Sequence, residues 1–245
     1  MIDREIDLAT SSGQMNTFVT HPEEGGPHPA ILFYMDAPGK REELHDMARR
    51  LGTAGYFVAL PNLYYRERRD FRMQPGEEGM KEMFGLMRTL RNGMVVEDTR
   101  TLLDFVDGEA AAKPGPVGVV GYCMSGPFVF SVAAAYPERI AAAASIYGAG
   151  LLTDRDDSPH LKADAIRGEI YFACAEIDEY APKEQIDALA RHLAGTDVNH
   201  RIEWYPGAHH GFAFPKREGI YDKPSAERHW ERLHALFARN LQGAA

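Results

Sequence analysis

The sequence predicts an α/β protein with a mostly parallel central sheet and helices on both faces. Short apolar runs of strand length alternate with longer segments of helical periodicity along most of the chain. The apolar runs are continuous, as in strands buried on both faces. Alternating strands and helices form βαβ units with right-handed crossovers, which place helices on both sides of a sheet. No repeat, low-complexity tract or linker interrupts the chain, so we expect one domain over residues 1–245.

The elements follow in order from the apolar runs and the turns between them. Strands are expected at 5–8, 14–20, 30–34, 56–60, 117–120, 140–147, 169–175 and 200–205. Helices are expected at 42–53, 80–106, 183–193 and 226–241, with a further helix from about Met124 and a break in 80–106 near Gly93. Ligands of open parallel sheets bind at the carboxyl ends of the strands. Residues directly after strands are therefore the candidate site residues.

Composition excludes several classes of function. The chain carries 27 Lys and Arg against 36 Asp and Glu, a net charge of −9, and has no dense basic run. An acidic surface gains nothing from counterion release, so nucleic acid is not an expected partner. No apolar stretch approaches the roughly 18 residues of a membrane span, and Met1–Ser12 does not resemble a secretory signal. We expect a cytoplasmic protein without a membrane association, as a monomer or small homo-oligomer.

The two cysteines, Cys123 and Cys174, lack the spacing of a metal site, and no disulfide scaffold is implied. We expect both thiols to be free, and no metal or organic cofactor. Cys174 lies inside the expected strand 169–175 and is interpreted as a core residue.

Cys123 has the setting of a nucleophile. It lies in Gly121-Tyr122-Cys123-Met124-Ser125-Gly126, directly after strand 117–120 and at the start of a helix. A nucleophile on such a strand-to-helix turn, usually written G-x-S-x-G, needs small neighbours two residues before and after it. Gly121 and Ser125 meet this need, and the helix dipole favours a thiolate. Ser125 is the alternative nucleophile, although it lies one turn into the helix.

A carboxylate and a histidine follow the later strands. Asp178 comes just after strand 169–175, and His210 just after strand 200–205. Both belong at the carboxyl edge with Cys123, in the order nucleophile, acid, histidine. The histidine takes the proton of the nucleophile, and the aspartate orients the imidazole. Glu176 and Glu179 stay open as alternatives to Asp178, and His209 as an alternative to His210, which we prefer because Gly211-Phe212 follows it.

An oxyanion hole needs two backbone N–H groups. We expect one from Met124, after the nucleophile, and one from Ala37, in the loop after strand 30–34. Asp36 lies in the same loop. A carboxylate near Cys123 would favour the protonated thiol, so Asp36 is expected either to modulate the thiol or to cap the helix that starts near Arg41.

These residues resemble the dienelactone hydrolase family over nearly the whole chain. The strongest pieces are residues 121–126 and His210-Gly211-Phe212, supported by the Pro61-Asn62-Leu63-Tyr64 turn and by Asp178. The resemblance implies an α/β-hydrolase fold, a Cys123–His210–Asp178 triad, an acidic residue at Asp36 near the resting thiol, and no cofactor. Two features depart from the best-known members: Ser125 replaces a glycine, and the arginines that bind the dienelactone carboxylate have no secure counterparts.

The expected function is hydrolysis of a small carboxylic ester or lactone through a cysteine acyl-enzyme. The alternatives are a thioesterase or other acyl hydrolase on the same fold, and a catalytically silent binding protein. Residues expected to contact the substrate are Tyr64, Arg66, Tyr122 and Phe212, with Arg217 as a further candidate by location.

Overall fold

The computed structural model describes residues 1–243, and the chain divides into two compact units. The first covers Met1–Gly115 and the second starts at Pro116. The prediction of a single domain over 1–245 stays a prediction.

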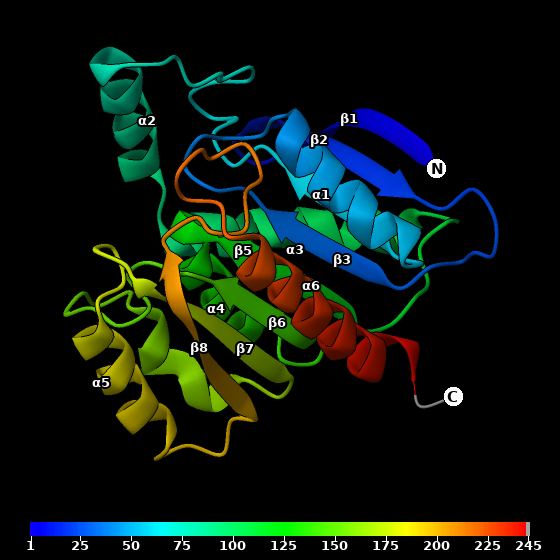
Figure 1. Cartoon of the computed structure of the whole chain (residues 1–245). Coiled ribbons are helices and arrows are strands. Elements are labelled where there is room, and N and C mark those ends of the chain that lie inside the picture. The colour runs from blue at the N-terminus through cyan, green and yellow to red at the C-terminus, as the bar shows by residue number, and fades with distance from the viewer. Residues whose placement is uncertain (244–245) are drawn as a thin grey trace. The chain divides into compact units, whose positions relative to one another are not determined.

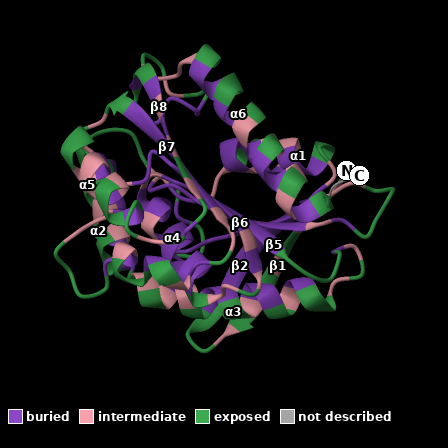
Figure 2. Cartoon of the chain, turned by 90° about the horizontal axis from the view of Figure 1, so that it is seen from below, coloured by how far each residue is buried: buried purple, intermediate pink, exposed green. Residues whose placement is uncertain are grey.

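The first unit is built on an antiparallel hairpin and a parallel pair of strands. It contains β1 (Ile2–Thr10), β2 (Gly13–His21), β3 (Ala30–Tyr34), β4 (Phe57–Pro61), α1 (Glu42–Thr53), α2 (Glu77–Thr89) and α3 (Asn92–Gly108) (Figure 1). The strand order is β1-β2-β4-β3, with β2 antiparallel to both neighbours and β3 parallel to β4. Figure 2 shows α1 and α3 on opposite sides of these strands.

Burial follows the sequence pattern of each strand. All five residues of β3 and all five of β4 are buried, as continuous apolar runs predict. In β1 half-buried and exposed residues alternate, because successive side chains of a strand point to opposite faces. The loops after β3 and β4 therefore begin from fixed strand ends.

The segment expected as one helix over 80–106 forms two helices, α2 and α3. The break falls at Leu90 and Arg91, whose backbone is extended, with ψ of 145° and 151°. The predicted break near Gly93 is confirmed and lies shortly before that glycine, which itself belongs to the first turn of α3.

The second unit is a parallel sheet with helices between its strands. It contains β5 (Val117–Tyr122), α4 (Gly126–Ala135), β6 (Ile140–Ile146), β7 (Glu169–Ile177), α5 (Lys183–Leu193), β8 (His200–His209) and α6 (Lys223–Phe237). The strands pair in the order β5-β6-β7-β8, all parallel. In Figure 2, α4 and α5 lie on one side of β6–β8 and α6 on the other. The carboxyl ends of β5, β7 and β8 therefore share one edge.

Several element ends differ from the expected ranges in the second unit, most clearly those of β8 and α6. β8 continues to His209, four residues further than expected, because it pairs with an extended β7 up to Ile177. α6 begins at Lys223, where the side chain of Asp222 accepts a hydrogen bond from the Ser225 N–H and caps the helix. Among the described residues, no helix is long and apolar enough to span a bilayer.

A buried ion pair holds the loop after β4 to α3. Both guanidinium Nη atoms of Arg66 donate to the Asp98 carboxylate at 2.8 Å, and the Tyr65 hydroxyl donates to it at 2.8 Å. The Asp98 side chain is 1% exposed and that of Arg66 13% exposed. A buried carboxylate that loses its cation is left uncompensated, so this contact stabilises the loop.

We expect Arg66→Met to lower the free energy of unfolding by about 3 kcal/mol, because it leaves Asp98 buried and without its cation. The matched control is Arg68→Met in the same loop, since Arg68 is 62% exposed and 3.5 Å from Glu82. That exposed pair contributes at most about 1 kcal/mol. Urea unfolding followed by circular dichroism measures both variants, and equal losses would contradict a stabilising role for the Arg66–Asp98 pair.

Candidate functional site

Cys123 occupies a strained turn at the end of β5. Its φ is 57°, in the left-handed region that residues with a Cβ seldom adopt. A 3-10 turn over Cys123–Ser125 leads directly into α4. Such strain persists only where the surrounding structure imposes it, and it is common at functional sites. The thiol is free and partly exposed.

Close packing around the turn explains its small residues. A Cβ on Gly121 would lie 2.8 Å from Val129 Cγ2 and 2.9 Å from the Ser125 carbonyl oxygen. A Cβ on Gly126 would lie 2.4 Å from the Cα of Gly148, in the segment after β6. Larger residues at either position would push α4 away from β5 and β6. Ser125 is fully buried, which removes the basis for regarding it as the alternative nucleophile.

Asp178 and His210 meet at the ends of the neighbouring strands β7 and β8. The backbone N–H of His210 donates to the backbone carbonyl of Ile177 at 3.1 Å, which continues the β7–β8 pairing past the last strand residues. His210 Nδ1 lies 2.8 Å from Asp178 Oδ2. Since the carboxylate can only accept, Nδ1 carries the proton and the other ring nitrogen, Nε2, is the one left for proton transfer.

The Asp178 carboxylate is itself held in place by the turn that follows β7. Its Oδ1 accepts hydrogen bonds from the Tyr180 and Ala181 N–H groups at 2.9 and 3.0 Å. Its side chain is 1% exposed. Both oxygens therefore have partners, and the side chain can turn only if these bonds break.

The Cys123 thiol lies close enough to His210 to affect the charge of the imidazole. Burial lowers the pKa of His210, but the hydrogen bond with Asp178 and the interactions with Cys123 outweigh it and raise the pKa to about 9. Nε2 is buried and makes no well-directed hydrogen bond with any described residue. Electrostatic attraction, without a fully formed hydrogen bond, therefore describes the contact between thiol and imidazole.

The alternatives to Asp178 and His210 are exposed and lie outside this hydrogen-bonded pair. The exposed Glu176 carboxylate accepts a hydrogen bond from the Gly207 N–H at 2.6 Å, and Glu179 is exposed. His209 is the last residue of β8 and is exposed. None of these three makes a contact with the Asp178–His210 pair that would replace either member.

Two residues that sequence reasoning missed flank His210. The ring of Tyr147 lies 5.0 Å from the imidazole and that of Tyr180 lies 4.8 Å from it, measured between centroids. Tyr147 follows β6 with a positive φ of 38°, and Tyr180 is 54% exposed. The available signal was position, because both residues follow strands at the same edge as Cys123.

Most of the expected substrate contacts have structural roles instead. Tyr122 is fully buried, with its hydroxyl 3.0 Å from His229 Nε2, and Phe212 is fully buried against Tyr205. The guanidinium of Arg66 is used by Asp98, as described above. Arg217 stacks its guanidinium over Phe214, 4.9 Å from the ring centroid. We therefore carry none of these four into the functional proposal.

The first unit contains the remaining expected site residues. Asp36 is fully buried and pairs with the Arg41 guanidinium. It does not cap α1, whose first residues make no side-chain cap hydrogen bond, so that alternative was wrong. The Tyr64 hydroxyl donates to the Ala37 carbonyl at 2.8 Å, which fixes the loop after β3. Tyr64 is 1% exposed, so its role here is to hold that loop.

Within residues 1–243, no three His, Cys, Asp or Glu side chains gather in a way that could hold a metal ion.

Comparison with known proteins identifies the family. A model of the dienelactone hydrolase family matches residues 15–241. A Synechocystis protein described as "Putative carboxymethylenebutenolidase" is 26% identical over 240 residues, which cover 97% of this chain and 96% of that protein.

Solved structures agree on the fold. A Klebsiella pneumoniae protein described as "Putative Dienelactone Hydrolase" superposes with a TM-score of 0.85 at 21% identity, covering 97% of this chain and 98% of the other. A metagenomic dienelactone hydrolase-like promiscuous phosphotriesterase superposes with a TM-score of 0.80 at 18% identity, covering 98% of both chains. The predicted α/β-hydrolase fold is thus confirmed, and with a family match over most of its length this chain belongs to the dienelactone hydrolase family.

Proposed function

We propose that this protein hydrolyses a small carboxylic ester or lactone through a thioester on Cys123. The observation that carries the proposal is the position of His210, hydrogen-bonded to Asp178 through Nδ1 and in electrostatic contact with Cys123. An imidazole oriented by a buried carboxylate, beside a thiol on a strained turn, is the arrangement of an activated nucleophile.

The reaction has two stages. The Cys123 sulfur attacks the ester carbonyl as the thiol proton passes to Nε2 of His210, and the tetrahedral intermediate collapses as His210 gives that proton to the departing alkoxide. A thioester and an alcohol result. A water molecule then attacks the thioester while His210 accepts its proton, and the thiolate leaves with the carboxylic acid as product. Asp178 stabilises the imidazolium in both stages without taking up its proton.

The negative oxygen of each tetrahedral intermediate needs donors. In the proposal these are the backbone N–H groups of Met124, directly after Cys123, and of Ala37, in the loop that Tyr64 holds. Asp36 keeps its proposed role of favouring the neutral thiol. Its pairing with Arg41 offsets part of its negative charge, so we expect a smaller influence than an unpaired carboxylate would have.

Exposed apolar residues beside the triad suit an apolar part of the substrate. Tyr180, in ring contact with His210, is 54% exposed, and Ile177 at the end of β7 is 48% exposed. An acyl or alkoxy group that covers these side chains would remove apolar surface from water. The proposed substrate is therefore an ester or lactone with an apolar group next to the carbonyl.

Cys123→Ala is expected to reduce kcat/KM for p-nitrophenyl acetate by at least about 10⁴-fold, because it removes the nucleophile. The matched control is Cys174→Ala, which alters the other free thiol, buried in β7, and should keep the activity. Initial-rate kinetics on folded samples measure both, and an active Cys123→Ala protein would exclude the cysteine mechanism.

His210→Ala is expected to lose about 10²–10⁴-fold in kcat, as loss of a general base does. His209→Ala should lose little, since His209 is exposed at the end of β8. The two variants differ by one position and are compared with the same ester. The assignment would be reversed if His209→Ala were the inactive protein.

The charge of His210 should also affect stability. Its pKa in the folded protein is about 9, above the ordinary 6.5. The folded state thus binds the proton more tightly, so this stabilisation is complete below pH 6.5 and is lost as the pH rises toward 9. We expect the free energy of unfolding to fall over that window, and His210→Gln to flatten the fall. Urea unfolding at both limits tests this, and an equal slope in the variant would refute it.

A further inference from the structure

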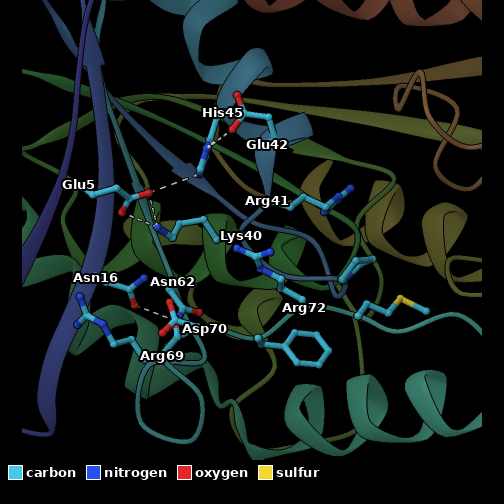
Figure 3. A pocket seen from close by; sticks show the side chains of 13 residues that line it. Glu5, Asn16, Lys40, Arg41, Glu42, His45, Asn62, Arg69, Asp70 and Arg72 are labelled. Atoms are coloured by element: carbon cyan, nitrogen blue, oxygen red, sulfur yellow. Dashed lines mark hydrogen bonds and ion pairs between the residues drawn. The ribbon is translucent and has the colours of Figure 1, made fainter.

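The first unit contains a cavity of about 630 Å³ that the proposed triad does not line (Figure 3). Its walls come from β1, β2, the loop after β3, the start of α1 and the loop after β4. Ligand cavities in proteins commonly have volumes of about 300–1,000 Å³. We infer that this cavity binds a small organic carboxylate with an apolar body.

Asn16 supplies a donor from within the wall of the cavity. The Asn62 Nδ2 atom donates to the Arg68 and Arg69 carbonyls at 2.8 and 2.9 Å and to Asn16 Oδ1 at 3.0 Å. The two carbonyls fix the orientation of Asn62, so the atom of Asn16 that faces it must be the oxygen. Asn16 Nδ2 therefore points away from Asn62, as Figure 3 shows.

This amide donor is almost buried and unused. Asn16 is 5% exposed, and among residues 1–243 its side chain has no partner besides Asn62. A polar group at such a site costs free energy unless a ligand or water accepts its hydrogen bond. The structure thus provides a fixed N–H donor for an acceptor atom inside the cavity.

Arg72 provides a cation without a competing partner. Within the described part of the chain its guanidinium makes no hydrogen bond or ion pair, while the neighbouring Arg69 is paired with Asp7 at 2.6 Å. A free guanidinium can bind both oxygens of a carboxylate. Lys40 adds a second positive charge, although it is shared with Glu5 at 2.6 Å.

The acidic residues that line the cavity do not prevent it from binding an anion. Glu5 is bound by Lys40, and Glu42 is bound by Arg49 at 2.6 Å. Asp70 makes no hydrogen bond or close ion pair within residues 1–243, is exposed, and interacts with Arg69 only through its charge. The negative charge of Asp70 repels an anionic ligand, so removing this charge should strengthen binding if the proposal is right.

An apolar wall completes the site. Pro38, Phe71 and Met73 line the cavity, and Phe71 is held edge-on against Tyr64 with ring centroids 5.7 Å apart. A flat or aliphatic body can pack on this wall while its carboxylate reaches Arg72 and Asn16. Inorganic anions would use only the polar wall and should bind more weakly.

The test is isothermal titration calorimetry of the full chain with benzoate, with benzamide as the neutral ligand of the same shape. We expect benzoate to bind and benzamide to bind at least about tenfold more weakly, because benzamide lacks the charge for Arg72. Inorganic phosphate serves as the anion without an apolar body. Absence of benzoate binding, or equal binding of benzamide, would overturn the inference.

Four variants locate the site. Arg72→Gln and Asn16→Asp should each weaken benzoate binding by about tenfold or more. The aspartate keeps the acceptor for Asn62, but it removes the donor and adds a negative charge that repels the benzoate carboxylate. Arg68→Gln, in the same loop but outside the cavity wall, should leave the dissociation constant unchanged. Asp70→Asn should tighten binding. Loss of binding in Arg68→Gln, or weaker binding in Asp70→Asn, would contradict the assignment. If Asn16→Asp does not fold, Arg72→Gln decides the test, because Arg72 is exposed and its replacement should not disturb folding.

Discussion

The hydrogen bond between His210 Nδ1 and Asp178 Oδ2 is the interaction on which the proposed chemistry depends. It assigns the proton to Nδ1, so Nε2 is the atom left to exchange a proton with Cys123. The bond is possible because β7 and β8 are parallel neighbours that end together. Two backbone N–H groups fix Asp178 from its other side, so the carboxylate is oriented before a substrate arrives. Such preorganisation reduces the rearrangement that catalysis must otherwise bring about.

The conformation of Cys123, the proposed nucleophile, depends on backbone packing in the same way. Cys123 keeps its positive φ because α4 lies close to β5 and β6, with Gly121 and Gly126 at the contacts. Any Cβ at these positions would push the helix away and relax the turn. The cost of the strained conformation is therefore offset by packing of the surrounding core, and the thiol is held at the carboxyl edge beside His210.

The periodicity of the sequence predicted the fold more reliably than it predicted side-chain contacts. Apolar runs marked β3, β4 and β5 because buried strands need such runs, and the turn chemistry around Cys123 is local. The break between α2 and α3 was predicted near Gly93 because glycine is a helix-breaking signal, whereas Leu90 and Arg91, where the break falls, carry no such signal. Arg66, Tyr122 and Phe212 were expected at the substrate, but their partners Asp98, His229 and Tyr205 are distant in sequence. Long-range pairing of this kind, like the ring contacts of Tyr147 and Tyr180, requires the folded chain.

The central claim is that the acyl group passes through Cys123, and trapping that intermediate tests it most directly. The protein would be mixed with p-nitrophenyl acetate, quenched in acid within the first turnover, digested and analysed by mass spectrometry. The account predicts an acetyl group on the peptide that contains Cys123, at the Cys123 sulfur, and its accumulation when His210 is replaced by a residue that cannot activate water. Turnover of the ester with the acetyl group on another residue, such as Ser125, and none on Cys123 would contradict it.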